Sequence, residues 1–382
     1  MKRVKNISFS RRPITSPKNQ GATFVELFFD LVFVFAVTQV VGLLHDGLTW
    51  ISVGQAVLVF WLVWWAWTQF TWTLNAADTT HPWIELGTLA AVAAAFFMAV
   101  ALPTAFHEGA LGFAVAYILV RVIGLAFQIW VAWTDPSQRS AVRTFALISI
   151  GGLVAVLTGG LVGGAVLYGL WGLAILLDLV AATVGGQSEG WNLHPEHFAE
   201  RHGLFVIIAL GETLIVAASG VAGAVWTPDL IAVTGLAVAI TCGLWWSYFP
   251  QTKPALEHAL ASERGAERSK LARDVFSLLH FPMLCGVIAY AFVIEEAVAH
   301  PGEPLTFGGR LALAFGLMLF VGGAAIAVRR ATRQPMLPRV LLLIGTVVAV
   351  IVLVVTPWLS LTIAFAGVAL IALLEQWQGN SA

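Results

Sequence analysis

The feature that most constrains this chain is a series of long apolar runs that recurs from one end to the other. An apolar stretch of about 18 or more residues is long enough to cross a bilayer as a helix, which bonds all of its backbone polar groups internally. We count twelve such runs, at residues 24–45, 51–74, 83–105, 110–133, 143–160, 163–185, 203–222, 229–249, 275–298, 307–328, 339–356 and 358–376. Only 11% of the residues are charged, where soluble proteins carry about 25%. The sequence therefore predicts an all-α, polytopic transmembrane bundle of about 12 spans.

The positions of lysine and arginine predict how this bundle is oriented, because short cytoplasmic loops carry an excess of these residues. If the N-terminus is cytoplasmic, 18 of the 20 lysines and arginines fall in the N-terminal arm or in loops on the cytoplasmic side. The other two are Arg121, within a span, and Arg310, near an outer helix end. Both termini are therefore expected in the cytoplasm.

The chain is expected to form one transmembrane domain, residues 23–378, after a basic cytoplasmic arm, residues 1–22. This arm shows no cleavable signal peptide. A weak internal similarity pairs the tripeptide at 24–26 with that at 198–200, and the Trp-rich segment at 64–67 with that at 245–248. It would divide the domain into halves at 23–190 and 191–378, related by an axis along the membrane normal. The spacings between the paired segments differ, so a 6+6 repeat and a single undivided bundle both remain open.

Composition excludes several classes of function. A net charge of −1 provides no strong field for nucleic acid. Both cysteines lie in apolar segments, so no disulfide framework is implied. No nucleotide-binding motif, metal-ligand spacing or cofactor motif is apparent. The expected partners are the lipid bilayer and a small solute or proton, and the sequence does not fix the oligomeric state.

Ionisable residues inside the predicted spans are the first candidates for function. Such residues are costly in a bilayer, so they normally face a protein interior or an aqueous cavity and find a partner there. Arg121 and Glu212 each lie about 14–15 Å deep, near the middle of a ~30 Å core, which predicts an ion pair between them, with Asp30 as the second choice for Arg121. Asp30, Asp178 and His280 lie about 8–10 Å from the cytoplasmic side on the same arithmetic.

Glu26 and Asp30 are four residues apart, so they share one face of the first span. Two neighbouring acids favour a shared proton, which predicts an entry path for a proton or cation. The alternative is structural: Glu26 caps the helix near its N-terminal dipole and Asp30 anchors a neighbouring helix. For Arg121, likewise, the structural alternative is a fixed buried bridge.

Two further segments lie near the cytoplasmic side. Residues 194–202 contain three histidines and two glutamates, and His197, Glu200, Arg201 and His202 form the candidate interface motif. A hydrated interfacial loop is favoured there over a metal site, because no fixed ligand spacing supports one. The tryptophans at 61–72 are attributed mainly to interfacial anchoring, with a cation–π surface for an organic cation as the alternative. At His280, the following proline is expected to kink the helix, with a hinge as the alternative.

These residues also carry a family resemblance. The segment 26–36, ELFFDLVFVFA, and the segment 197–212, HFAERHGLFVIIALGE, are similar to the two main motifs of the bacterial low temperature requirement protein A (LtrA) family, and 244–246 and 280–282 follow in the expected order. The resemblance covers the chain from about residue 24 to residue 300 and leaves the last two spans without a recognised motif. It matches Glu26, Asp30, His197, Glu200, Arg201 and Glu212 to family motif positions. It implies a bacterial inner-membrane protein connected with growth in the cold, and no substrate or mechanism.

The sequence therefore leads to two functional hypotheses. The first is a secondary transporter for an unknown solute, coupled to protons through intramembrane acids, since these acids outnumber the arginine counted inside the spans. The second is a scaffold or lipid-interacting factor that supports growth at low temperature, in which the charges only lock helices together. No nucleophile–base pair or metal triad can be assembled, so no enzymatic activity is expected.

Overall fold

The computed structural model describes residues 14–17, 20–45, 47–185, 191 and 193–379. Much of the predicted basic arm, residues 1–22, and the predicted boundary between the halves at residue 190 lie outside the described residues. Within the described part the chain is almost entirely helical, and the one extended pairing is an isolated bridge between Thr15 and Ala77. The prediction of an all-α bundle is confirmed.

Six long helices form the first part of the bundle. They are α1 (Phe24–Gly42), α2 (Trp50–Ala76), α3 (Pro82–Ala101), α4 (Ala110–Thr134), α5 (Arg139–Val162) and α6 (Gly164–Gly185). Local signals set several of their ends: the Thr49 side chain caps α2, and Pro82 begins α3, where a missing backbone N–H costs nothing. The tight turn between α5 and α6 has φ of 69° at Gly163 and 57° at Gly164, a conformation that glycine adopts without steric cost.

The second part contains nine helices among its described residues, and several of them join into longer rods. They are α7 (Pro195–Val221), α8 (Pro228–Ser247), α9 (Lys253–Ser262), α10 (Gly265–Leu271), α11 (His280–Ala299), α12 (Phe307–Leu317), α13 (Gly323–Thr332), α14 (Leu337–Val352) and α15 (Pro357–Gly379). π-helical turns at Tyr248–Thr252, Ala272–Leu278 and Met318–Gly322 connect α8 to α9, α10 to α11 and α12 to α13. Such turns insert one extra residue into a helix and are frequent at functional sites.

The described chain has eleven helical segments long and apolar enough to cross a membrane, and α14 is a shorter apolar helix of 16 residues. The expected count of about 12 agrees with eleven spans plus this short helix. Several predicted boundaries were wrong, among them the following two. The span predicted at 339–356 ends earlier, at Val352, and the span predicted to begin at residue 203 already begins at Pro195.

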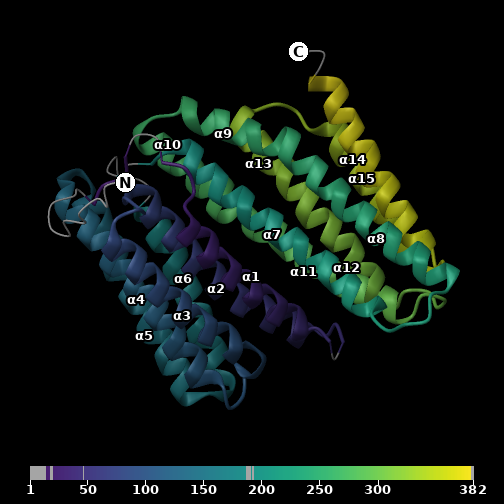
Figure 1. Ribbon diagram of the computed structural model, residues 1–382, viewed down its shortest axis with the longest axis horizontal. Helices are drawn as coiled ribbons and strands as arrows, with labels where there is room; N and C mark the ends of the chain where they lie inside the picture. The colour runs from purple at the N-terminus through teal and green to yellow at the C-terminus, as the bar shows by residue number, and fades with distance from the viewer. Residues whose placement is uncertain (1–13, 18–19, 46, 186–190, 192, 380–382) are drawn as a thin grey trace, which may run out of the picture.

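The helices follow the same order of packing in both parts of the bundle. In the first part α1 packs on α3, α3 on α4, α4 on α5 and α5 on α6, and in the second part α7 packs on α11, α11 on α12, α12 on α14 and α14 on α15. α1 and α7 lie side by side where the two parts meet, and α1 begins at the same end of the bundle at which α15 ends (Figure 1). The 6+6 repeat stays a prediction.

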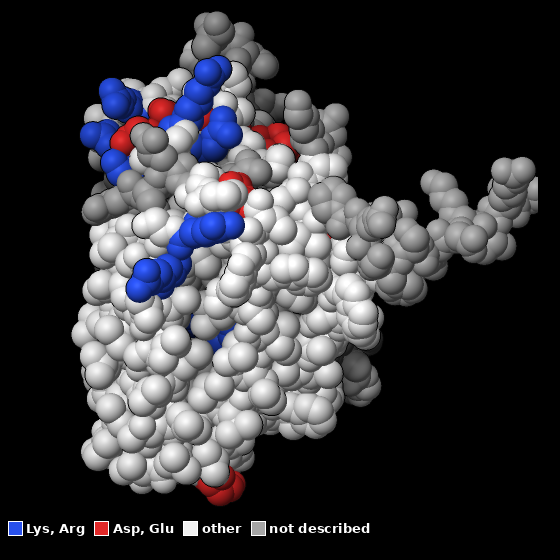
Figure 2. Space-filling model, turned by 90° about the vertical axis from the view of Figure 1, so that its left-hand side faces the viewer, with Lys and Arg blue, Asp and Glu red and all other residues white. Residues whose placement is uncertain are grey.

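The outer surface is apolar over most of its area. On the face shown in Figure 2, lysine and arginine side chains gather in the upper part and the broad surface below is largely uncharged. Phe97, Leu147 and Ile215 are each more than half exposed. Contiguous exposed apolar surface on this scale is expected where a protein meets lipid.

Candidate functional site

A buried charge cluster joins α1 to α7. The Arg201 guanidinium on α7 donates from Nη1 to Glu26 Oε1 at 2.6 Å and from Nη2 to Asp30 Oδ1 at 2.6 Å. All three side chains are at most 1% exposed. The four-residue spacing of the acids places both on the face of α1 that meets α7. One guanidinium therefore bridges the two carboxylates that the sequence predicts to share a proton.

Further contacts hold the two carboxylates in place. The Trp67 indole N–H on α2 donates to Asp30 Oδ1 at 2.7 Å. Glu26 Oε2 accepts from the Thr23 backbone N–H at 2.9 Å, so Glu26 also caps α1. The contacts expected from the structural alternative are thus present: Glu26 caps its helix, and Asp30 anchors α2 and α7.

The hydrogen bonds of His197 determine the charge of this cluster. Asn75 Oδ1 accepts from the His194 backbone N–H at 2.8 Å, so the amide Nδ2 of Asn75 faces His197 Nδ1 at 3.2 Å. An amide nitrogen can only donate, so Nδ1 accepts and the proton of a neutral imidazole lies on Nε2. That proton points at Glu26 Oε1, 3.1 Å away. When His197 is neutral, two carboxylates face one guanidinium, so the cluster carries one excess negative charge in a dry interior.

Arg121 on α4 pairs with Asp178 on α6. Its Nη2 lies 3.2 Å from Asp178 Oδ1, and both side chains are buried. Tyr117 and Ser149 also accept from the guanidinium. The prediction that Arg121 pairs with Glu212 was therefore wrong. The second choice, Asp30, was also wrong, because Asp30 is bonded to Arg201.

The prediction failed because the depth of a residue in the membrane does not show which neighbouring helix its side chain faces. Arg121 lies in the first part of the bundle, where α4 packs on α2, α3 and α5. Glu212 lies on α7, which packs on α1, α2, α8 and α11. The Arg121 guanidinium instead points toward Ser149 on α5 and Asp178 on α6, so a similar predicted depth did not bring it to Glu212.

Glu212 is the predicted site carboxylate that forms no ion pair among the described residues. It is 7% exposed, and no described side chain forms an ion pair or hydrogen bond with it. The predicted depth of about 14–15 Å assumed a helix start at residue 203; because α7 begins at Pro195, seventeen residues before Glu212, the residue lies about 25 Å along this helix. An ionisable residue inside a membrane span normally faces a partner or an aqueous cavity, so the unpaired Glu212 is a candidate functional position.

His280 forms a separate polar contact beside a π-helical turn. Its Nδ1 donates to the Val275 carbonyl at 2.7 Å, and its Nε2 lies 2.7 Å from the Tyr248 hydroxyl. Tyr248 begins the π-helical turn after α8, and His280 follows the π-helical turn before α11. The contact between Tyr248 and His280 therefore joins two irregular helix segments. Whether the region acts as a kink or as a hinge stays open.

The segment expected to be a hydrated loop was misjudged. His197, Arg201 and His202 are buried within α7, and Glu200 accepts from the Ala22 backbone N–H at 3.0 Å. His194, just before the helix, is partly buried, and this burial, with the nearby His197 and Arg268, lowers its pKa. Among the described residues, no group of three or more potential ligands is placed to hold a metal ion.

Several site residues were missed or misassigned from the sequence. Trp64 and Trp67 are fully buried, so they do not anchor an interface as expected, and Trp67 instead bonds Asp30. Tyr117 was not singled out, although its position one helical turn before Arg121 could have indicated contact with the guanidinium. Arg201 was expected at the interface because its helix was predicted to begin at residue 203.

The fold and these contacts define a multi-pass helical membrane protein with paired charges inside its bundle. Comparison with known proteins then shows the family: residues 21–374 match the profile described as bacterial low temperature requirement A protein (LtrA). The chain belongs to this family. It is also 31% identical over 315 residues to an uncharacterized protein of Rhizobium meliloti (strain 1021), across 79% of this chain and 76% of that protein.

Proposed function

We propose that this LtrA family member is a proton-coupled secondary transporter of the bacterial inner membrane. The observation that carries the proposal is Glu212, a carboxylate deep in the bundle with no positive partner among the described residues. Arg121 and Asp178 balance each other, whereas Glu212 needs a proton or cation in order to stay in this environment. A site that binds and releases a proton inside the membrane is what coupling to a proton gradient requires.

The cluster on α1 and α7 supports the same proposal. It lies where the two parts of the bundle meet, and it is one positive charge short when His197 is neutral. Uptake of a proton there would weaken the attraction of Arg201 for one carboxylate and so loosen the contact between α1 and α7. In transporters built from repeats, one bundle rocks against the other around a central site.

The test is transport by purified protein in proteoliposomes with an imposed pH gradient and a fluorescent pH indicator inside. The native protein should move protons when its solute is supplied from a pool of small polar compounds. Glu212→Gln should abolish this coupling. Glu303→Gln, in the segment between α11 and α12, is the matched control and should leave coupling unchanged. If none of the supplied compounds produces protein-dependent flux, the proposal fails.

A second candidate function rests on a different observation. The carboxylates of Glu26, Asp30 and Asp178 are at most 2% exposed, as expected of a scaffold whose charges only lock helices together. The scaffold predicts that Asp30→Asn lowers stability and activity together. If Asp30→Asn leaves the melting temperature unchanged but removes growth in the cold, the scaffold is excluded.

A further inference from the structure

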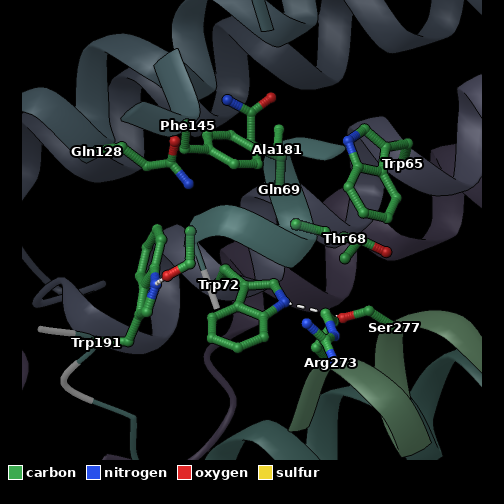
Figure 3. Close-up of a pocket in the computed structure, with 12 residues that line it drawn as sticks. Trp65, Thr68, Gln69, Trp72, Gln128, Phe145, Ala181, Trp191, Arg273 and Ser277 are labelled. Atoms are coloured by element: carbon green, nitrogen blue, oxygen red, sulfur yellow. Dashed lines mark hydrogen bonds between the residues drawn. The ribbon is translucent and has the colours of Figure 1, made fainter. Parts of the chain in front are cut away.

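The cavity on the predicted cytoplasmic side of the first part of the bundle contains polar groups that no contact satisfies. It holds about 40 Å³ of space for the centres of water-sized molecules. Its lining comes from α2, α4, α5, α6, Trp191 and the π-helical turn before α11 (Figure 3). Trp65 Nε1, Thr68 Oγ1, Gln69 Oε1 and Gln128 Oε1 are buried and have no hydrogen-bond partner. Buried polar atoms are almost always bonded, so four unsatisfied ones around one cavity indicate a site for a small polar molecule.

The free groups include both acceptors and donors. Gln69 is oriented by its Nε2, which donates to the Arg121 carbonyl at 3.4 Å, and this leaves Oε1 without a donor. Two indole N–H groups of the lining are already used, since Trp72 donates to Ser277 at 2.9 Å and Trp191 to the Gly185 carbonyl at 2.8 Å, whereas Trp65 Nε1 has no hydrogen-bond partner. The occupant must therefore supply N–H or O–H donors to the glutamine oxygens, and it can accept in return from the Thr68 hydroxyl or the Trp65 indole.

The charge and size of the cavity narrow the class of molecule that could bind in it. None of the described residues that line the cavity is a carboxylate, so a cation has no counter-ion among them. The lining guanidinium, Arg273, is already bonded to Asp274 at 2.6 Å, so an anion is not favoured either. A water molecule needs roughly 10–15 Å³ on this measure, so the cavity holds the equivalent of about three or four waters. Indole rings of Trp65, Trp72 and Trp191 line it and suit a flat molecule.

We infer that this cavity is a binding site for a small, uncharged amide of the urea type. Two amide N–H groups would donate to Gln69 and Gln128, and the carbonyl oxygen would accept from Thr68. The site is connected to the buried charges, because the Trp65 indole faces Asp178, and Gln69 bonds the backbone of Arg121. The inference rests on the proposed transport function only in treating this ligand as a transported solute.

The test is equilibrium dialysis of the full-length protein in nanodiscs with radiolabelled urea, a measurement that requires no transport. Saturable binding is expected. Thr68→Val and Gln128→Met should each weaken it about three- to tenfold, the equivalent of one lost hydrogen bond. Ala182→Leu, which fills the cavity without removing a polar group, should abolish binding. The matched control is Gln55→Met, because Gln55 also lies on α2 but bonds Tyr168, and it should bind urea as the native protein does.

Two results would overturn the inference. One is the absence of saturable binding, which would mean that ordered waters alone satisfy Thr68, Gln69 and Gln128. The other is equal binding by the native protein, Thr68→Val and Ala182→Leu, which would place the site elsewhere. If the native protein shows no saturable urea binding but Glu212-dependent proton flux persists, only this inference is rejected. If urea binds but no flux occurs, only the proposed transport is rejected.

Discussion

The pairing of Arg121 can be tested by comparing two double-mutant cycles. Both side chains of the Arg121–Asp178 pair are at most 2% exposed. Asp178→Asn would leave the guanidinium with only the neutral Tyr117 and Ser149. Removing one partner of a buried ion pair typically costs about 3–5 kcal/mol, because the other charge is stranded in a low-dielectric interior. Arg121→Gln and Asp178→Asn should each destabilise by about this amount.

The double mutant should be less damaged than the sum of the two single mutants, with a coupling of about 1–3 kcal/mol, the range found for residues in contact. The control cycle combines Arg121→Gln with Glu212→Gln and should show coupling below about 0.5 kcal/mol, as for separate sites. The assay is equilibrium unfolding in mixed micelles with increasing sodium dodecyl sulfate, followed by circular dichroism. Coupling to Glu212 and additivity with Asp178 would refute the pairing.

Two further predictions concern packing and anchoring. Trp67→Phe removes the donor to Asp30 and should destabilise the protein by about 1.5–3 kcal/mol, the range for hydrogen bonds to charged groups. Trp246→Phe, at an exposed position, should change the stability little. Equal effects of the two substitutions in the same unfolding assay would contradict the buried contact. A Cβ on Gly286 would lie 2.6 Å from the Gly316 carbonyl oxygen, whereas one on Gly345 would meet nothing within 4 Å. Gly286→Ala should therefore lower stability by about 1–3 kcal/mol and Gly345→Ala should not, and a stable Gly286→Ala protein would show that α11 and α12 are not so close.

The helices could be predicted from the sequence because each span is a local property of about 20 residues. Partners inside the bundle could not, since apolar helices look alike on every side and their packing depends on close fit between small and large side chains. Arg121 and Glu212 were matched by depth alone, and their true neighbours depend on which helices touch. The start of α7 had a usable signal, because Pro195 favours the first position of a helix, and it would have placed Arg201 beside the acids of α1.

The choice of Glu26, Asp30 and Asp178 as important residues needed only the rule that charges in a membrane find partners. Their partners Arg201 and Trp67, and the Tyr117 hydroxyl that accepts from Arg121, came from the structure. The cavity beside Trp65 could not have been predicted, because its polar atoms come from α2 and α4, which are distant in sequence.

Chemical labelling of Glu212 tests most directly whether a proton resides inside this bundle. Dicyclohexylcarbodiimide is an apolar reagent that modifies protonated carboxyl groups in membranes, and mass spectrometry of peptides locates the modification. We predict modification at Glu212 in the native protein, while Asp178, held by Arg121, reacts far less. If Glu212 stays unmodified, or if the native protein and Glu212→Gln take up the reagent equally, Glu212 is not the proton-binding group.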